Sequence, residues 1–156
     1  MRRGLLRLAP VSVSQVQKAA AKAVTGMEGF CSNVMRTVDF QPTNVSARDN
    51  GAMGFPWKAN RGALNGFNSA HGGALAILAD AFTRIHMNAA NPGAEVSSVS
   101  FEISYLNAVQ EGEECTCVTR LVSDSKTGLH HMEYSFEDKK GKKVFSRGIH
   151  VLSCSQ

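Results

Sequence analysis

The sequence lacks a hydrophobic run long enough to cross a lipid bilayer. A membrane-spanning helix needs about 20 consecutive apolar residues, and no stretch of this 156-residue chain reaches that length. A composition of 43% hydrophobic and 19% charged residues also excludes a disordered or fibrous chain. We therefore expect one globular domain with a single core and no membrane span.

Cysteine is scarce and forms no metal-binding motif. The four cysteines, at positions 31, 115, 117 and 154, contain no Cys-x-x-Cys pair, and the five histidines lack zinc-ligand spacing. Cys115 and Cys117 would point to the same face of a strand. No glycine-rich nucleotide loop is present either. We expect reduced structural thiols, no metal and no cofactor.

Aromatic residues are few, at 7%, and do not alternate with basic ones, so nothing indicates a nucleic-acid surface. Arg2, Arg3 and Arg7 account for three of the four net positive charges, which leaves +1 for the rest of the chain. A lysine cluster at 139–143 predicts a solvated hairpin tip, with a docking point for phosphate as the alternative.

Acidic residues are missing from the start of the chain, where Glu28 is the first. In residues 1–11 arginines alternate with leucines, and serines follow, which is typical of a mitochondrial presequence. The alternative is an ordinary basic, amphipathic start of a cytosolic protein. We therefore separate a candidate targeting leader, 1–11, from one domain, 12–156, and expect a mitochondrial or cytoplasmic location.

What is present is a series of helix and strand patterns. The N-terminal half predicts a helix at 12–27, short strands at 34–40 and 44–53, a loop at 54–70 and a helix at 72–90. The last helix is stopped by Asn91-Pro92-Gly93. It is apolar nearly all round, so we expect neighbours to wrap most of its surface.

The C-terminal half predicts four strands. Apolar and polar residues alternate cleanly at 99–105, and the pattern continues at 115–122, 129–137 and 143–153. Each connection is short enough to join antiparallel neighbours. The chain therefore predicts an α+β fold, in which an antiparallel sheet is wrapped around one long central helix.

His71-Gly72-Gly73 stands where the loop becomes that helix. A helix start exposes backbone N–H groups and the positive end of the dipole, which suits an oxyanion, and glycine permits close approach of a ligand. The alternative is that the glycines only allow tight packing, with His71 as a capping or core residue.

Asp80 lies inside an apolar run of the same helix. A buried carboxylate needs a partner or a purpose. Arg84, four residues on, is the structural partner, whereas a general base is the functional interpretation. Asp80 is about 12 Å along the helix from Gly72, so a catalytic role predicts a dimer whose active sites are shared between two chains.

Asn65, His71-Gly72-Gly73 and Asp80, with Ser98 at the next strand and Gly148-x-His150 in the last, resemble the hotdog-fold acyl-CoA thioesterases. Their phenylacetate-pathway branch and animal acyl-CoA thioesterase 13-like members are the most similar. The resemblance covers the chain from about residue 12 onward. It implies a hotdog fold, acyl-CoA hydrolysis in lipid metabolism, and a homodimer that pairs into a homotetramer.

The resemblance also implies roles for five residues. The Gly72 N–H would hold the thioester oxyanion, and His71 would position that turn. Asp80 of the other subunit would activate water as a general base, Ser98 would position the water, and Asn65 would hold the nucleophile or the thioester. Direct attack by Asp80 through an anhydride remains an alternative.

Substrate-binding expectations are carried by a further set of residues. Gly73 belongs with Gly72 to the half of the site that binds the electrophile. Phe55 and Trp57, in a loop that departs from the family pattern, would form apolar walls of the acyl pocket. The candidate ligands of the coenzyme A phosphates are Arg61, Lys142 and Arg147.

Two other functions fit the same fold. An enoyl-thioester hydratase usually carries a His-aromatic dipeptide followed by proline, which His71-Gly72 lacks. A non-catalytic acyl-thioester-binding or scaffold dimer is the second alternative, although such a binder has little use for a carboxylate at Asp80 beside Asn65 and Ser98.

Overall fold

The computed structural model describes residues 10–124 and 128–155. Most of the candidate leader, 1–9, lies outside that part of the chain. The described residues form three helices and seven strands: α1 (Val13–Gly26), α2 (Gly29–Thr37), β1 (Ser46–Ala47), β2 (Met53–Lys58), α3 (Gly72–Ala90), β3 (Glu95–Phe101), β4 (Ser104–Tyr105), β5 (Glu114–Asp124), β6 (Leu129–Asp138) and β7 (Val144–Ser155).

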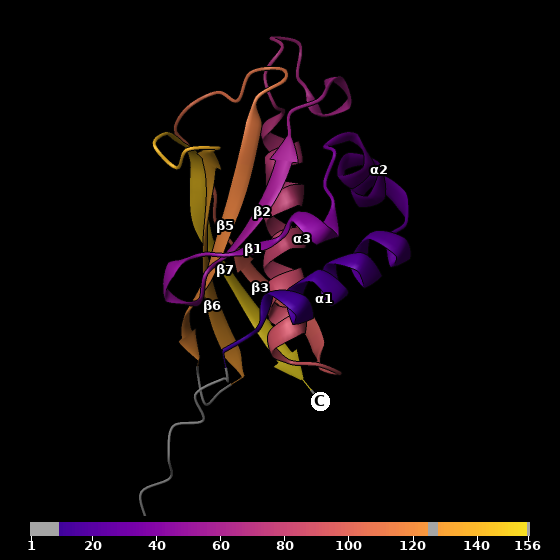
Figure 1. Ribbon diagram of the computed structural model, residues 1–156, viewed down its shortest axis with the longest axis vertical. Helices are drawn as coiled ribbons and strands as arrows, with labels where there is room; N and C mark the ends of the chain where they lie inside the picture. The colour runs from indigo at the N-terminus through magenta and orange to yellow at the C-terminus, as the bar shows by residue number, and fades with distance from the viewer. Residues whose placement is uncertain (1–9, 125–127, 156) are drawn as a thin grey trace, which may run out of the picture.

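The strands form one antiparallel sheet in the order β1-β2-β5-β6-β7-β3, with β4 also beside β7. Helix α3 lies against one face of this sheet, and α1 and α2 pack on the opposite side of α3 (Figure 1). This arrangement confirms the predicted α+β architecture with one central helix. No helix among the described residues is long and apolar enough to cross a membrane.

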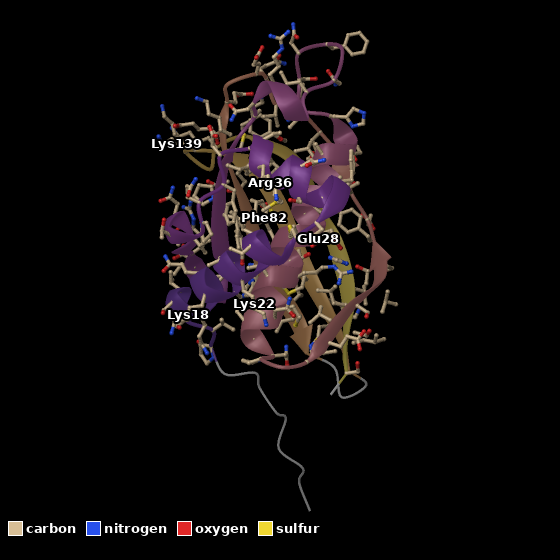
Figure 2. The ribbon with its side chains drawn as sticks, turned by 90° about the vertical axis from the view of Figure 1, so that its right-hand side faces the viewer. Lys18, Lys22, Glu28, Arg36, Phe82 and Lys139 are labelled. Atoms are coloured by element: carbon tan, nitrogen blue, oxygen red, sulfur yellow. The ribbon has the colours of Figure 1, made fainter. Side chains whose placement is uncertain are left out.

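The two long helices have the boundaries that the sequence predicts. A capping box between Ser12 and Gln15 starts α1, which buries Val16 and Ala20. Its outward side carries charges such as Lys18 and Lys22 (Figure 2). Eleven of the 19 residues of α3 are buried, because the sheet and the two other helices cover it from both sides.

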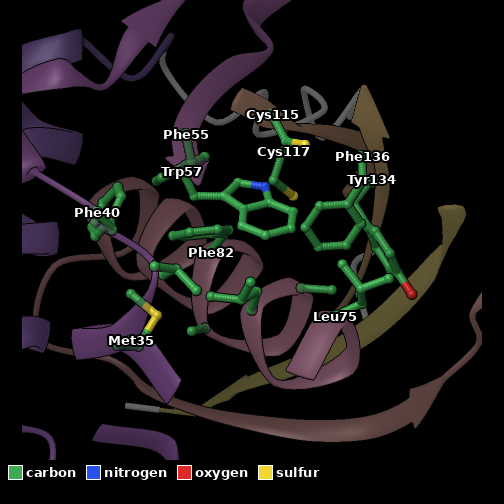
Figure 3. Packing of buried hydrophobic residues seen from close by; sticks show 14 of the residues in the cluster. Met35, Phe40, Phe55, Trp57, Leu75, Phe82, Cys115, Cys117, Tyr134 and Phe136 are labelled. Carbon is green, nitrogen blue, oxygen red and sulfur yellow. The ribbon is translucent and has the colours of Figure 1, made fainter. Parts of the chain in front are cut away.

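The core is organised around aromatic rings. Phe82 of α3 lies 4.8 Å from Phe55 and 4.9 Å from Phe40 between ring centroids, and Trp57 meets Phe136 edge-on at 5.7 Å. Figure 3 shows these rings filling the space between α3 and the sheet. Such pairs add about 1 kcal/mol each to the burial of their surface, so they fix α3 against the sheet.

Three predictions for the segment before α3 are wrong. The expected strand at 34–40 is mostly helix α2, in which the buried Ser32 and Met35 are three residues apart, as on one face of a helix. The expected strand at 44–53 is interrupted by the 3-10 turns Pro42–Asn44 and Asp49–Gly51, with the two-residue β1 between them.

The expected loop at 54–70 begins with most of strand β2. Gly54 and Pro56 hide this strand, because both residues are rare inside strands, yet Met53, Phe55 and Trp57 alternate inward as a strand requires.

The hairpins β5–β6 and β6–β7 confirm the predicted antiparallel neighbours. The connection after β4 does not join antiparallel neighbours, contrary to the prediction. Strands β3 and β4 pair with β7, whereas β5 pairs with β2 and β6. The connection 107–113 therefore does not join neighbouring strands, because the chain passes from one edge of the sheet to its middle. Strand β3 is left as an edge.

Candidate active site

The start of α3 presents backbone donors that have no partner among the described residues, and Gly72 carries the first of them. His71 is the extended residue before the helix, and its Nδ1 accepts the Gly73 N–H at 2.9 Å. The Gly72 N–H has no acceptor among the described residues. His71 is thus the cap that the structural interpretation predicted, while the amide beside it remains available to an anion.

Tyr105 holds the same turn from the other side. Its hydroxyl donates to the Gly72 carbonyl at 2.9 Å, and its ring lies so close that a Cβ at position 72 would come within 3.1 Å of it. The peptide between Gly72 and Gly73 is therefore held at its carbonyl by Tyr105 and at its N–H by His71. The sequence offered no signal for this role of Tyr105.

Asn65 closes the loop that leads to the helix. Its Oδ1 accepts from the backbone N–H of Phe67 at 2.8 Å and of Ser69 at 3.2 Å, and its Nδ2 donates to Ser69 Oγ at 3.0 Å. This is the local hydrogen bonding typical of asparagine in turns. In a single chain Asn65 thus shapes the turn, and contact with a thioester remains a prediction.

Asp80 is more open than the sequence predicted. Its side chain is 40% exposed, because it lies on the stripe of α3 that faces the edge strand β3, where the sheet ends. Arg84 Nε donates to both carboxylate oxygens, at 3.0 and 3.2 Å. The expected pair with Arg84 is confirmed, whereas full burial of the carboxylate was wrong.

Ser98 of β3 joins this pair to the core. Its Oγ lies 3.2 Å from Asp80 Oδ1, 2.7 Å from Arg84 Nη2 and 2.8 Å from His150 Nε2. His150 is fully buried, and its Nδ1 lies 2.7 Å from Thr83 Oγ1. Burial lowers the pKa of His150, with Asp80 opposing this shift and Arg84 adding to it.

Four of the five predicted catalytic residues form two groups, and the fifth, Asn65, lies in the loop before the helix. His71 and Gly72 lie together at the helix start, while Asp80 and Ser98 lie together about 12 Å further along the helix. Arg84 was considered only as an ion-pair partner, and His150 only as part of a motif. Residue Thr83 was not predicted, because its partner stands 67 positions away in the chain.

The predicted substrate-binding residues lie apart from one another. Phe55 and Trp57 belong to β2 and are buried in the core, so they line no open wall in the single chain. Arg61 is exposed in a 3-10 turn, and Lys142 lies in the β6–β7 hairpin turn that the lysine cluster predicted. Arg147 is exposed on the face of β7 opposite His150.

Comparison with known proteins agrees with this fold. The family model of the thioesterase superfamily matches residues 67–145, which is half of the chain and includes most of the candidate site. The chain therefore belongs to the thioesterase superfamily, and its fold is the hotdog fold. Membership supports thioester hydrolysis as its general activity.

Solved structures of the same fold come from animals and bacteria. The zebrafish thioesterase superfamily member 2 is 22% identical, with a TM-score of 0.73 over 92% of this chain and 97% of its own. The Escherichia coli PaaI protein from the phenylacetic acid degradation operon is 18% identical, with a TM-score of 0.70 over 93% and 97%.

A Streptococcus mutans protein bound to acetyl CoA is 15% identical, with a TM-score of 0.64 over 75% of this chain and 89% of its own. A comparison with curated protein sequences gives no match.

Proposed function

We propose that the protein hydrolyses acyl-CoA thioesters to the free acid and coenzyme A. The observation that carries this proposal is that one helix presents both a half-exposed carboxylate, Asp80, and an unpartnered backbone amide, Gly72. A thioester hydrolase needs a base for water and a donor for the carbonyl oxygen. The acetyl CoA bound to the Streptococcus mutans relative supports coenzyme A as the thiol part of the substrate.

The chemistry uses Asp80 as a general base. Water attacks the thioester carbon while Asp80 removes one of its protons, and the Gly72 N–H stabilises the oxyanion that forms. Collapse of this intermediate breaks the carbon–sulfur bond, and the proton from Asp80 passes to the leaving thiolate. The products are a carboxylic acid and coenzyme A.

The two groups come from different chains in the proposed dimer. Strand β3 is a sheet edge whose only partner in the described part of the chain is β7, and Val99 on it is 55% exposed. Such an edge is a template for a second strand. Antiparallel pairing of β3 with its copy would set two α3 helices side by side, so that each Asp80 faces the partner's helix start. We further propose that such dimers pair into tetramers.

Release of free thiol from short, long and aromatic acyl-CoAs tests the activity directly. Turnover of any of these thioesters supports a thioesterase, and the panel identifies the acyl group that the protein prefers. The competing function, a non-catalytic acyl-thioester-binding dimer, predicts saturable binding of acyl-CoA with no thiol released.

The shared site is tested by mixing two inactive chains. A Gly72→Pro chain lacks the amide donor and an Asp80→Ala chain lacks the base, so each homodimer should be inactive. A mixed dimer contains one site with both groups intact and should recover up to about half of the activity of the unmodified dimer, since one of two sites works. Mixed dimers that form and remain inactive would refute sharing between chains.

A further inference from the structure

Arg84 makes a set of contacts that an ordinary surface ion pair does not make. Besides both oxygens of Asp80, its guanidinium donates to Ser98 Oγ from Nη2 and to the Val96 carbonyl from Nη1, each at 2.7 Å. Its side chain is only 33% exposed. One residue of α3 therefore connects the proposed base, the proposed water-positioning hydroxyl and the backbone of β3.

Ser98 Oγ lies within hydrogen-bond distance of two acceptors, Asp80 Oδ1 at 3.2 Å and His150 Nε2 at 2.8 Å, and its one proton can serve only one of them. The Thr83 hydroxyl donates to the Ala79 carbonyl oxygen at 2.7 Å. Because this bond uses the one proton of the hydroxyl, Thr83 Oγ1 is the acceptor toward His150, and His150 Nδ1 is the donor. A neutral His150 then has a lone pair on Nε2, which accepts the hydrogen bond of the Ser98 hydroxyl at 2.8 Å. Neutral His150 agrees with its buried position.

Arg84 is consequently the donor that fixes Asp80. With its proton on the His150 side, Ser98 places a bare oxygen 3.2 Å from Asp80 Oδ1. Two acceptors at this separation repel each other unless a shared donor bridges them. Arg84 is that donor, since its planar group reaches both.

We propose that Arg84 is a positioning residue of the hydrolytic site, where it holds Asp80 and Ser98 as two fixed acceptors for the two protons of the attacking water. Asp80 takes one proton, and the free lone pair of Ser98 accepts a hydrogen bond from the other. This inference rests on the proposed thioesterase function. Its anchor is the Val96 carbonyl, which ties the guanidinium to the strand.

The test compares Arg84→Met, Arg84→Lys and Arg84→Ala with Arg120→Met. Arg120 is a matched control, because it forms a 2.6 Å ion pair with Glu133 between β5 and β6 and contacts neither Asp80 nor Ser98. Loss of the planar Arg84 guanidinium should lower kcat about 100-fold through misplacement of water, with KM changed less than about threefold. Arg84→Lys should recover little of the lost kcat, since one ammonium group cannot donate to Asp80, Ser98 and Val96 in the planar geometry of a guanidinium.

Chemical rescue separates positioning from general stability. Free guanidinium or methylguanidinium, at concentrations below those that unfold the protein, should restore kcat of Arg84→Ala saturably and leave Arg120→Met unchanged. Urea unfolding of each variant shows whether it is folded, and Arg84→Lys keeps the chain length and charge if the smaller residues destabilise the protein.

Two results would overturn the inference. In the first, the unmodified protein hydrolyses acyl-CoA, and folded Arg84→Met or Arg84→Lys has a kcat within about threefold of the unmodified value. The second is a loss confined to KM, with no rescue of Arg84→Ala. Absence of hydrolysis by the unmodified protein on every acyl-CoA of the panel would instead overturn the proposed function, and this inference with it.

Discussion

The start and the middle of helix α3 are built in opposite ways. At the start, the Gly72 N–H is left without an acceptor, and the groups around it, His71 and Tyr105, only hold the peptide in place. Two turns later, Asp80 and Ser98 are acceptors gathered around one donor, Arg84. A vacant donor and a set of gathered acceptors are complementary, but one rigid helix keeps them apart.

The two regions also depend on the sequence differently. The reacting group at the start is a backbone amide, and the side chains of His71 and Tyr105 only hold it in place. The middle is made of side chains from α3, β3 and β7, so it exists only when the sheet has folded. Substitutions at the middle should therefore affect chemistry more than substitutions that only adjust the start.

The largest expected effect is that of Asp80→Asn. The amide keeps the shape of the side chain and can still accept from Arg84, but it cannot take a proton from water, so kcat should fall by about 100- to 10,000-fold. Thiol release measures the change. Asp39→Asn is the matched control, because Asp39 is exposed and asparagine tolerates its positive φ of 51°. Turnover of Asp80→Asn close to that of the control would remove Asp80 from the mechanism.

Gly72→Pro should cause the next largest loss of kcat, and Gly72→Ala is its matched control. Proline is tolerated at the first position of a helix, and His71 already has the extended backbone, with ψ 132°, that proline requires before it. Both variants add a Cβ near Tyr105, but only proline removes the N–H. The kcat of Gly72→Pro should be lower than that of Gly72→Ala by about 100-fold or more. Equal rates would show that this amide does not bind the oxyanion.

The contrast also shows what could be read from the sequence. Helix α3 and the hairpins of β5, β6 and β7 were predicted because their periodicity is clean. Helix α2 and strand β2 were missed because their core contacts, and not local propensity, decide their structure; Pro56 in particular disfavours a strand. Asp80 and Ser98 were predicted to act on one water, but the link from Ser98 to His150 and Thr83 was missed for a related reason: Ser98 and His150 are 52 residues apart. The exposure of Asp80 was missed because it depends on where the sheet ends.

Tyr105→Phe should lower kcat less than Asp80→Asn or Gly72→Pro does. The ring that packs on Gly72 is kept, while the hydrogen bond to the Gly72 carbonyl is lost. One such bond is worth about 1 kcal/mol, which corresponds to roughly a fivefold lower kcat if it serves to aim the neighbouring amide. KM should change little. The double variant with Gly72→Pro is informative, since loss of the donor should make the tyrosine hydroxyl irrelevant to kcat.

The far end of the same helix should leave turnover unchanged and alter stability instead. His86 is buried, with Nδ1 2.8 Å from Thr119 Oγ1, and burial lowers the pKa of His86 from 6.5 to about 4. Folding therefore favours the neutral ring. Its contribution to stability is complete above pH 6.5 and is lost as the pH falls from there toward 4.

Between about pH 7.5 and about pH 5 this group should lower the free energy of unfolding by about 2 kcal/mol. Urea unfolding of the unmodified protein and of His86→Gln at the two pH values measures it, because glutamine keeps a polar contact with Thr119 and does not titrate. The same pH dependence in both proteins would assign the acid sensitivity to other groups, of which His150 is the first candidate, since burial lowers its pKa as well. Because His86 contacts neither Gly72 nor Asp80 among the described interactions, a changed kcat at neutral pH would show that the two regions of α3 are coupled through the helix itself.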